Sequence, residues 1–206
     1  MRVIAGTHRG RQLRAPPGPA TRPTSDRVRE AIFDILQSLV DVDGARVLDL
    51  FAGSGAMGIE ALSRRAGHAV FVESDAAAVV VLRDNLATLW LEDRADVVRA
   101  DAPTWLAGPK ARGAPFDLAL CDPPYRFDAW EAVLDALDAE VAVLESGRAL
   151  EPGPRWEVHR SRRYGGTLVT VVRRAPNAPS VASAPGGRAG PELTPEELAP
   201  EKKGTA

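Results

Sequence analysis

The sequence of 206 residues predicts a single α/β domain built around a mostly parallel sheet. Short apolar runs rich in Val, Leu and Ala alternate along the chain with longer segments of helical periodicity. Alternation of this kind implies right-handed crossovers between parallel strands. A hydrophobic content of 45% is enough for one buried core, and the length indicates no second one.

The chain begins with two short extended segments, residues 2–5 and 11–13, which Gly6 and Gly10 separate. They predict a small hairpin arm that presents His8, Arg9, Arg11 and Arg14. Residues 15–24 are proline-rich and predicted to be irregular. Ser25 is placed to cap a helix with one apolar face, made of Val28, Ile32, Ile35, Leu36 and Leu39.

The rest of the chain is expected to alternate strand and helix. The predicted strands are 46–51, 69–73, 95–99, 117–121 and 141–145, and the predicted helices are 57–66, 76–89, 102–107 and 128–139. Residues 156–161 and 167–173 flank Tyr164-Gly165-Gly166, which predicts an antiparallel hairpin at the sheet edge. Residues 175–206 are rich in Pro, Ala, Gly, Ser and Glu and predict a disordered tail.

A glycine-rich turn follows the first of these strands, at Gly53, Gly55 and Gly58. Glu73 ends the next apolar run, at the distance expected of an acid that binds a ribose hydroxyl. This pattern fits both a nicotinamide dinucleotide and S-adenosylmethionine. Asp49 favours S-adenosylmethionine, because a carboxylate inside the strand suits the ammonium of a methionine group better than a pyrophosphate. The alternative role for Asp49 is to cap the end of its strand.

Asp122-Pro123-Pro124-Tyr125 follows an apolar run, at the expected carboxyl end of a strand, where open α/β sheets bind ligands. The prolines remove two backbone donors, which leaves the Asp122 carboxylate and the carbonyl oxygens as acceptors. Such acceptors suit the N–H bonds of a planar exocyclic amine. Tyr125 is placed to stack on the ring, and such stacking is worth about 1–3 kcal/mol. The same sequence is also a common turn.

Residues 48–55 and 122–125 resemble the cofactor and catalytic motifs of class I S-adenosylmethionine-dependent amino-methyltransferases. The resemblance narrows to the ribosomal RNA small-subunit methyltransferase D family over about residues 1–174. It rests further on Arg-Val-Ile-Ala-Gly at 2–6, Arg-Gly-Arg at 9–11, Arg-Pro-Thr-Ser-Asp-Arg-Val-Arg-Glu-Ala-Ile-Phe at 22–33 and Tyr-Gly at 164–165. That family methylates the 2-amino group of one guanine in 16S ribosomal RNA.

The resemblance implies a Rossmann-like fold with seven strands, mostly parallel, of which the last is antiparallel. The sequence itself predicts an arm over 1–24, a methyltransferase domain over 25–174 and a disordered tail over 175–206, and the family pattern does not require the tail. The cofactor-binding residues that the resemblance implies are Asp49, Phe51, Gly53, Gly55, Glu73, Asp101 and Asp122. Asp101 matches the position that contacts the adenine amine of the cofactor, and it is also placed to cap the helix at 102–107.

Catalysis is expected of Asp122, Pro123 and Tyr125. Asp122 and the Pro123 carbonyl would hold the amine, and Tyr125 would stack on a flipped-out base. The proton would leave after the methyl group arrives, and whether Asp122 accepts it stays open.

Charge is unevenly divided along the chain, although the net charge is only −2. Residues 1–30 carry seven arginines and two acids, residues 31–150 ten basic and twenty acidic residues, and residues 151–174 six arginines and two acids. Arginine-rich ends around an acidic body predict a protein that holds RNA phosphates with its ends. The predicted RNA contacts are Arg2, Arg9, Arg11, Arg22, Arg29, Arg162 and Arg163.

Other features narrow the class of protein. Cys121 is the single cysteine and is predicted to be buried, and no signal peptide or membrane span is recognised, so a cytoplasmic location is expected. No Cys/His cluster resembles a metal site. The expected partner is 16S rRNA in the small subunit or a late assembly particle, and the expected state is a monomer. The alternatives are a DNA adenine or protein glutamine amino-methyltransferase, a nicotinamide oxidoreductase, and a non-catalytic assembly factor.

Overall fold

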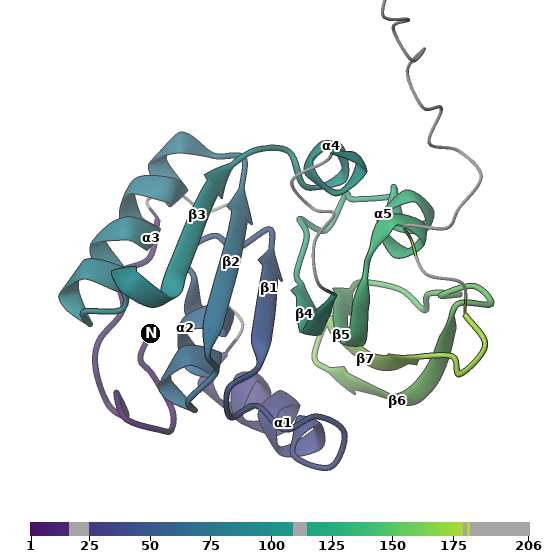
Figure 1. The fold of residues 1–206 in the computed structure, drawn as a ribbon, viewed down its shortest axis with the longest axis horizontal. Coiled ribbons are helices and arrows are strands. Elements are labelled where there is room, and N and C mark those ends of the chain that lie inside the picture. The colour runs from purple at the N-terminus through teal and green to yellow at the C-terminus, as the bar shows by residue number, and fades with distance from the viewer. Residues whose placement is uncertain (17–24, 109–114, 179–180, 182–206) are drawn as a thin grey trace, which may run out of the picture.

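The computed structural model describes residues 1–16, 25–108, 115–178 and 181. In this part of the chain seven strands form one sheet, in the order β3-β2-β1-β4-β5-β7-β6 (Figure 1). The strands are β1 Arg46–Leu50, β2 His68–Glu73, β3 Ala95–Arg99, β4 Phe116–Cys121, β5 Ala139–Ser146, β6 Trp156–Tyr164 and β7 Thr167–Arg174.

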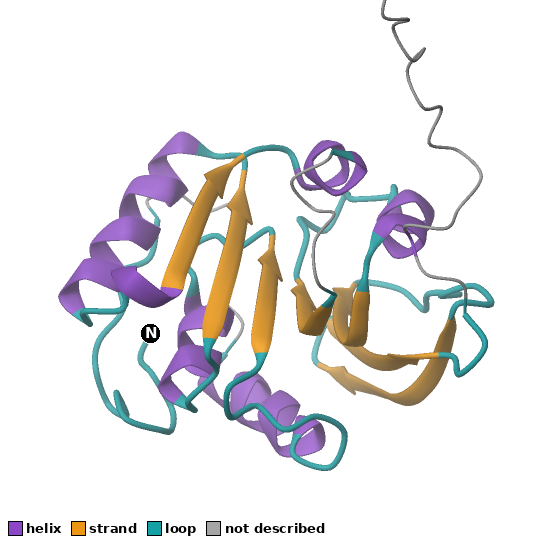
Figure 2. Cartoon of the chain, in the orientation of Figure 1, coloured by secondary structure: helices purple, strands orange, loops and turns teal. Residues whose placement is uncertain are grey.

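Helices cover both faces of this sheet (Figure 2). They are α1 Asp26–Leu36, α2 Ala56–Ser63, α3 Ala76–Thr88, α4 Ala102–Ala107 and α5 Trp130–Ala136, with a short 3-10 turn at Glu92–Arg94. One buried apolar cluster joins α1, α2 and α3 to the sheet, and a second joins α4 and α5 to the opposite face. The predicted α/β layering is therefore confirmed.

Strands β1 to β5 are parallel to one another, and β7 runs antiparallel to both of its neighbours, β5 and β6. This confirms a mostly parallel sheet whose last strand is antiparallel. The chain moves outward from β1 to β2 and β3 on one side and continues through β4 and β5 on the other. The strand order therefore reverses between β1 and β4, the position at which such sheets bind ligands beyond their carboxyl ends.

Local sequence accounts for most element boundaries. The Ser25 side chain accepts a hydrogen bond from the Val28 N–H and begins α1 as predicted. Helix α5 is shorter than the predicted 128–139, because Leu137 has an extended backbone and is fully buried ahead of β5. Cys121 is buried as predicted, and burial raises the pKa of its thiol.

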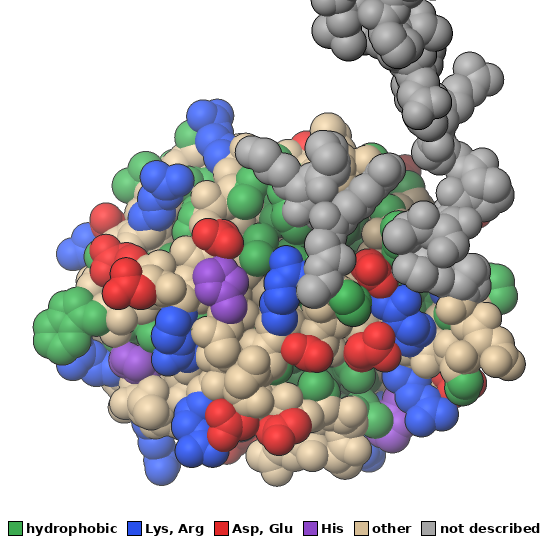
Figure 3. Space-filling model, in the orientation of Figure 1, with side chains coloured by type: hydrophobic (Ala, Val, Ile, Leu, Met, Phe, Trp, Pro, Cys, Tyr) green, Lys and Arg blue, Asp and Glu red, His purple; other side chains and the backbone are tan. Residues whose placement is uncertain are grey.

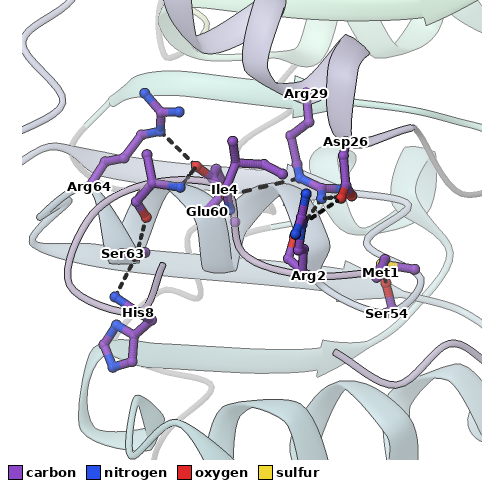
Figure 4. Close-up of polar contacts among 12 residues, drawn as sticks. Met1, Arg2, Ile4, His8, Asp26, Arg29, Ser54, Glu60, Ser63 and Arg64 are labelled. Carbon is purple, nitrogen blue, oxygen red and sulfur yellow. Dashed lines mark hydrogen bonds and ion pairs between the residues drawn. The ribbon is translucent and has the colours of Figure 1, made fainter. Parts of the chain in front are cut away.

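The N-terminal segment forms the predicted hairpin, and this hairpin packs against α2. An isolated antiparallel β-bridge between Arg2 and Gln12 pairs its two sides. Val3 and Leu13 are buried in the core. The Glu60 carboxylate of α2 accepts hydrogen bonds from the Ile4 N–H, at 2.7 Å, and the Ala5 N–H, at 3.0 Å (Figure 4). Buried backbone donors satisfied in this way fix the hairpin to the domain.

The predicted tail from residue 175 lies outside the described residues, apart from 175–178 and 181, and Arg22 also lies outside them. Among the described residues, no helix is long and apolar enough to cross a membrane.

Candidate active site

A cavity of about 680 Å³ lies beyond the carboxyl ends of the central strands. Its size falls within the range of small-molecule and cofactor sites. It is built from the ends of β1, β2, β4 and β5 and from the turn between β6 and β7. Its lining includes Asp49, Phe51, Gly53, Glu73, Asp122, Pro123, Tyr125, Glu145 and Thr167.

The glycine turn between β1 and α2 brings backbone close to this cavity. Gly53 and Gly55 have φ values of +54° and +80°, a region that favours glycine. A Cβ atom at Gly55 would lie 2.2 Å from Leu82 Cδ1, and one at Gly58 would lie 2.3 Å from Phe71 Cε1. The second and third glycines therefore allow close packing of the turn and of α2, as in a nucleotide-binding turn. Gly53 itself lines the cavity.

Asp49 lies at the base of the cavity and is 4% exposed. Its Oδ2 atom accepts a hydrogen bond of 2.8 Å from the Gly58 N–H. Burial raises the pKa of Asp49 well above its usual value against the lowering effect of that hydrogen bond, and the Asp122 and Glu73 carboxylates raise it further. Asp49 thus caps α2 and also lines the cavity. A cationic ligand would compensate its buried charge, so the residue fits the ammonium of a methionine group.

Glu73 ends β2 beside the glycine turn. Its Oε2 atom accepts a hydrogen bond of 2.7 Å from the Gly53 N–H, and its Oε1 atom accepts one of 2.8 Å from the Asp75 N–H. These bonds hold the carboxylate at the cavity wall. Because a carboxylate can accept about four hydrogen bonds, Glu73 can also accept from ribose hydroxyls.

Asp101 is placed differently from the other predicted cofactor residues. Its Oδ1 atom accepts hydrogen bonds from the Thr104 N–H and hydroxyl and caps α4. The side chain is exposed, and Asp101 is not one of the described residues that line the cavity. The structure therefore shows the capping role that the sequence also allowed.

All four residues of Asp122-Pro123-Pro124-Tyr125 line the cavity directly after β4. Tyr125 is 64% exposed, and its hydroxyl lies 3.4 Å from Thr167 Oγ1, across the mouth of the cavity. Phe51 packs edge-on against Phe127, with ring centroids 5.0 Å apart, and closes the adjacent wall. Acceptors and an aromatic ring therefore share one side of the cavity.

Glu145, near the end of β5, is a site residue that the sequence prediction missed. It is 4% exposed and lines the cavity. Cys121 pairs with Leu144, so Asp122 and Glu145 each follow a paired position on neighbouring parallel strands. The two residues therefore lie side by side at the carboxyl ends of β4 and β5. A charged residue at the end of the apolar run 141–144 was the available signal.

The predicted RNA contacts divide into two groups. Arg9, Arg11, Arg162 and Arg163 are exposed, and so is Arg2, whose Nε atom lies 3.1 Å from Asp26 Oδ2. Arg29 is 0% exposed, and it donates to the Arg2 carbonyl at 2.7 Å and to Asp26 Oδ1 at 2.9 Å (Figure 4). The prediction that Arg29 contacts RNA is therefore wrong, because its side chain does not reach the surface.

Solved structures share this fold. The Escherichia coli protein yhhF matches with a TM-score of 0.74 at 36% identity, over 84% of this chain and 97% of that chain. SMU.776, solved in complex with SAH, matches with a TM-score of 0.58 at 12% identity, over 71% of this chain and 48% of that chain, a likeness of fold. The class defined by this fold and by the relatives it matches is that of Rossmann-like methyltransferases.

Sequence relatives identify the family. The family described as "Conserved hypothetical protein 95" matches residues 1–173. "Ribosomal RNA small subunit methyltransferase D" of Escherichia coli K12 is 38% identical over 184 residues, 84% of this chain and 90% of that protein. The protein of the same name in Haemophilus influenzae is 37% identical over 138 residues, 66% of this chain and 70% of that protein. The chain belongs to the ribosomal RNA small subunit methyltransferase D family.

Proposed function

We propose that this methyltransferase modifies the exocyclic 2-amino group of one guanine in 16S rRNA. The observation that carries the choice of base is the placement of Asp122 beside Glu145 in one cavity. The Watson–Crick edge of guanine presents N–H donors at N1 and at the 2-amino group, whereas N1 of adenine is an acceptor. Two neighbouring carboxylates complement the guanine edge. The printed name of the E. coli relative supports the choice of small-subunit rRNA.

The chain contributes positioning to the transfer. Asp122 and the Pro123 carbonyl accept the N–H bonds of the 2-amino group and turn the nitrogen lone pair toward the methyl donor. Tyr125 stacks on the flipped-out base at the mouth of the cavity. When bound, S-adenosylmethionine supplies a methyl group that is already electrophilic. The new N–C bond would form as the bond between the methyl group and the sulfonium sulfur breaks. The nitrogen would then lose one proton, to solvent or to Asp122.

The cofactor is held by residues on the β1 and β2 side of the cavity. Asp49 pairs with its ammonium, Glu73 accepts from its ribose hydroxyls, and the backbone at Gly53 allows close approach. Phe51 completes this wall, and Gly55 lets the turn pack closely against Leu82 behind it. Asp101 lies outside the cavity lining and caps α4 through Oδ1, so its contact with the adenine amine is assigned to its Oδ2 atom.

The substrate is 16S rRNA within the small subunit or a late assembly particle, and the enzyme acts as a cytoplasmic monomer without a metal. RNA is held through exposed arginines on two parts of the molecule, the N-terminal hairpin and β6. These are Arg2, Arg9, Arg11, Arg162 and Arg163. Arg22, which lies outside the described residues, is proposed as a further contact from its place in the sequence alone.

The test uses small subunits from cells that lack the gene, incubated with the enzyme and methyl-labelled cofactor. Label in N2-methylguanosine at one position of 16S rRNA is expected. Label in N6-methyladenosine, DNA or protein would contradict the proposed substrate. Binding of the particle without any transfer would favour a non-catalytic assembly factor.

The variant Asp122→Ala tests the catalytic assignment. Loss of its carboxylate removes an acceptor for the amine, so transfer should fall at least about a hundredfold while cofactor affinity is retained. Single-turnover assays measure the first quantity and calorimetry the second. Turnover at the wild-type rate would remove Asp122 from the mechanism.

A further inference from the structure

Trp90 is an exposed indole with no packing role in the fold. It follows the end of α3, and 87% of its surface is exposed, the largest value among the exposed large apolar residues that the structure describes. Its φ of +55° lies in the left-handed region, which bulky side chains rarely adopt. Scattered apolar residues are common on protein surfaces. Trp90 is unusual because an unfavourable backbone conformation presents a large ring to solvent.

Basic residues of the N-terminal hairpin lie against the same end of α3. His8 Nε2 lies 3.1 Å from the Leu89 carbonyl oxygen, and an Arg11 guanidinium nitrogen donates to the Thr88 carbonyl at 3.4 Å. Arg9, which lies between His8 and Arg11 in the sequence, is exposed in the hairpin turn. Figure 4 shows His8 beside Ser63, whose side chain accepts a hydrogen bond of 2.9 Å from the His8 N–H. The hairpin turn is thereby fixed next to Trp90.

An exposed aromatic ring beside arginines has the chemistry of a single-stranded nucleic-acid site. Unpaired bases stack on such rings with little sequence preference, and arginines contact the neighbouring phosphates. An apolar protein partner would instead be matched by a continuous apolar patch. The hairpin side chains that contact Thr88 and Leu89, just before Trp90, are those of Arg11 and His8, which are charged or polar.

We propose that Trp90, with Arg9 and Arg11, forms a second RNA-binding site, in which an unpaired base stacks on the indole. This inference rests on the proposed function, because the RNA is taken to be the substrate. It adds a contact outside the cavity that receives the methylated base.

The two sites are separated by the length of α3. Ala77 and Ala78, in the first turn of this 13-residue helix, line the cavity, and Trp90 follows its other end. At 1.5 Å per residue the separation is about 20 Å. The hairpin runs along this path, since Met1 and Ala15 line the cavity and the hairpin turn lies near Trp90. The stacked base and the methylated base are therefore different nucleotides.

Tryptophan fluorescence tests this site directly. The chain has four tryptophans, and the other three, Trp105, Trp130 and Trp156, are at most 8% exposed. Titration with a short single-stranded oligoribonucleotide should quench the emission of the exposed indole in the wild type. Trp90→Phe should abolish that quenching and retain most of the affinity, because phenylalanine can still stack. Trp90→Ala should weaken binding about tenfold.

Val80→Ala is the matched control, since Val80 is also an exposed apolar residue of α3, at 60%. It should bind RNA as the wild type does, and thermal unfolding checks that all variants fold. Unchanged emission at saturating RNA, or wild-type affinity of Trp90→Ala, would overturn the inference.

Methyl transfer to small subunits separates the two proposals. If the wild type methylates rRNA and Trp90→Ala has an unchanged KM, only the second site fails, whereas absence of transfer by the wild type contradicts the proposed function.

Discussion

At the scale of single residues, the cavity gathers four carboxylates in a small volume. Asp49, Glu73, Asp122 and Glu145 all line it. Asp49 carries a cost in the protein without ligands, because its burial and the nearby Asp122 and Glu73 carboxylates disfavour its ionised form. The ammonium of the proposed methyl donor would remove that cost. The site is therefore complementary to its ligands at the expense of stability.

Asp49→Asn should reveal this trade-off. The pKa of Asp49 is higher in the folded protein than in the unfolded chain, so folding favours the neutral carboxyl group. The stabilisation from this group is complete below the pKa of the unfolded chain, and it is lost as the pH rises through the pKa of the folded protein. The cofactor-free variant should thus be more stable than the wild type at neutral pH, by about 1 kcal/mol or more, with a smaller difference at acidic pH. Urea unfolding at several pH values measures this difference.

The same variant should bind S-adenosylmethionine more weakly, because the ammonium loses its partner. Wild-type affinity should rise with pH as Asp49 ionises, and that rise should be absent from Asp49→Asn. A variant less stable than the wild type at every pH would show instead that the hydrogen bond from Gly58 dominates.

Glu145→Gln tests how guanine is recognised. The base 2-aminopurine keeps the 2-amino group but has an acceptor at N1. When this base is placed at the methylated position, the wild type should methylate it about 10- to 100-fold less efficiently than guanine. The reason is that its N1 lone pair faces the Glu145 carboxylate, which is also an acceptor. Glutamine can donate to N1, so the variant should lose most of this discrimination. Values of kcat/KM for the two RNAs measure it, and equal discrimination by both enzymes would exclude Glu145 from base recognition.

At the scale of elements, the sequence predicted the strands whose hydrophobic pattern is local. It did not predict the burial of the N-terminal hairpin, which depends on residues far along the chain. Apolar runs located β1, β2, β4 and β5 because buried strands leave a continuous signal, and the shorter run at Val97 and Val98 located the partly exposed edge strand β3. Burial of Val3 and Leu13 depends on Glu60 and Ser63, more than forty residues away, which a short polar hairpin does not reveal. Arg29 did carry a signal, because it shares the helical spacing of the buried residues Ile32, Phe33 and Leu36.

The hairpin offers a matched pair of glycines. Gly6 and Gly10 have nearly the same φ, +81° and +82°, so replacement by alanine strains both equally. A Cβ at Gly6 would lie 1.9 Å from the Ser63 carbonyl oxygen, whereas one at Gly10 meets nothing within 4 Å. Gly10→Ala should cost about 1 kcal/mol, and Gly6→Ala at least about 3 kcal/mol, because the hairpin must move off α2. Urea unfolding compares them, and equal losses would show that the hairpin does not need this close contact.

At the scale of the whole molecule, the arginine-rich ends of the sequence are folded onto different sides of the sheet. The hairpin lies against α3, which covers β2 and β3, and β6 forms the opposite edge (Figure 1). Figure 3 shows basic and acidic side chains interspersed over the viewed face, without a single basic patch. The acidic cavity lies between the two ends, since the β6–β7 turn also lines it. RNA held at both ends would therefore cross the cavity.

The salt dependence of RNA binding separates the roles of the two ends. The variants Arg9→Gln/Arg11→Gln and Arg162→Gln/Arg163→Gln should each reduce the slope of log K against log salt by about 0.7–0.9 for every phosphate that the variant no longer neutralises. Because the pairs lie on different elements, the fourfold variant should show the sum of both reductions. Arg173→Gln is the control, since Arg173 pairs with Glu157 at 2.8 Å and its removal should leave the slope nearly unchanged. An unchanged slope in one double variant would exclude that end from RNA binding. If the fourfold variant reduces the slope no more than either double variant does, the two ends do not hold the same RNA at once. The RNA then does not cross the cavity between them.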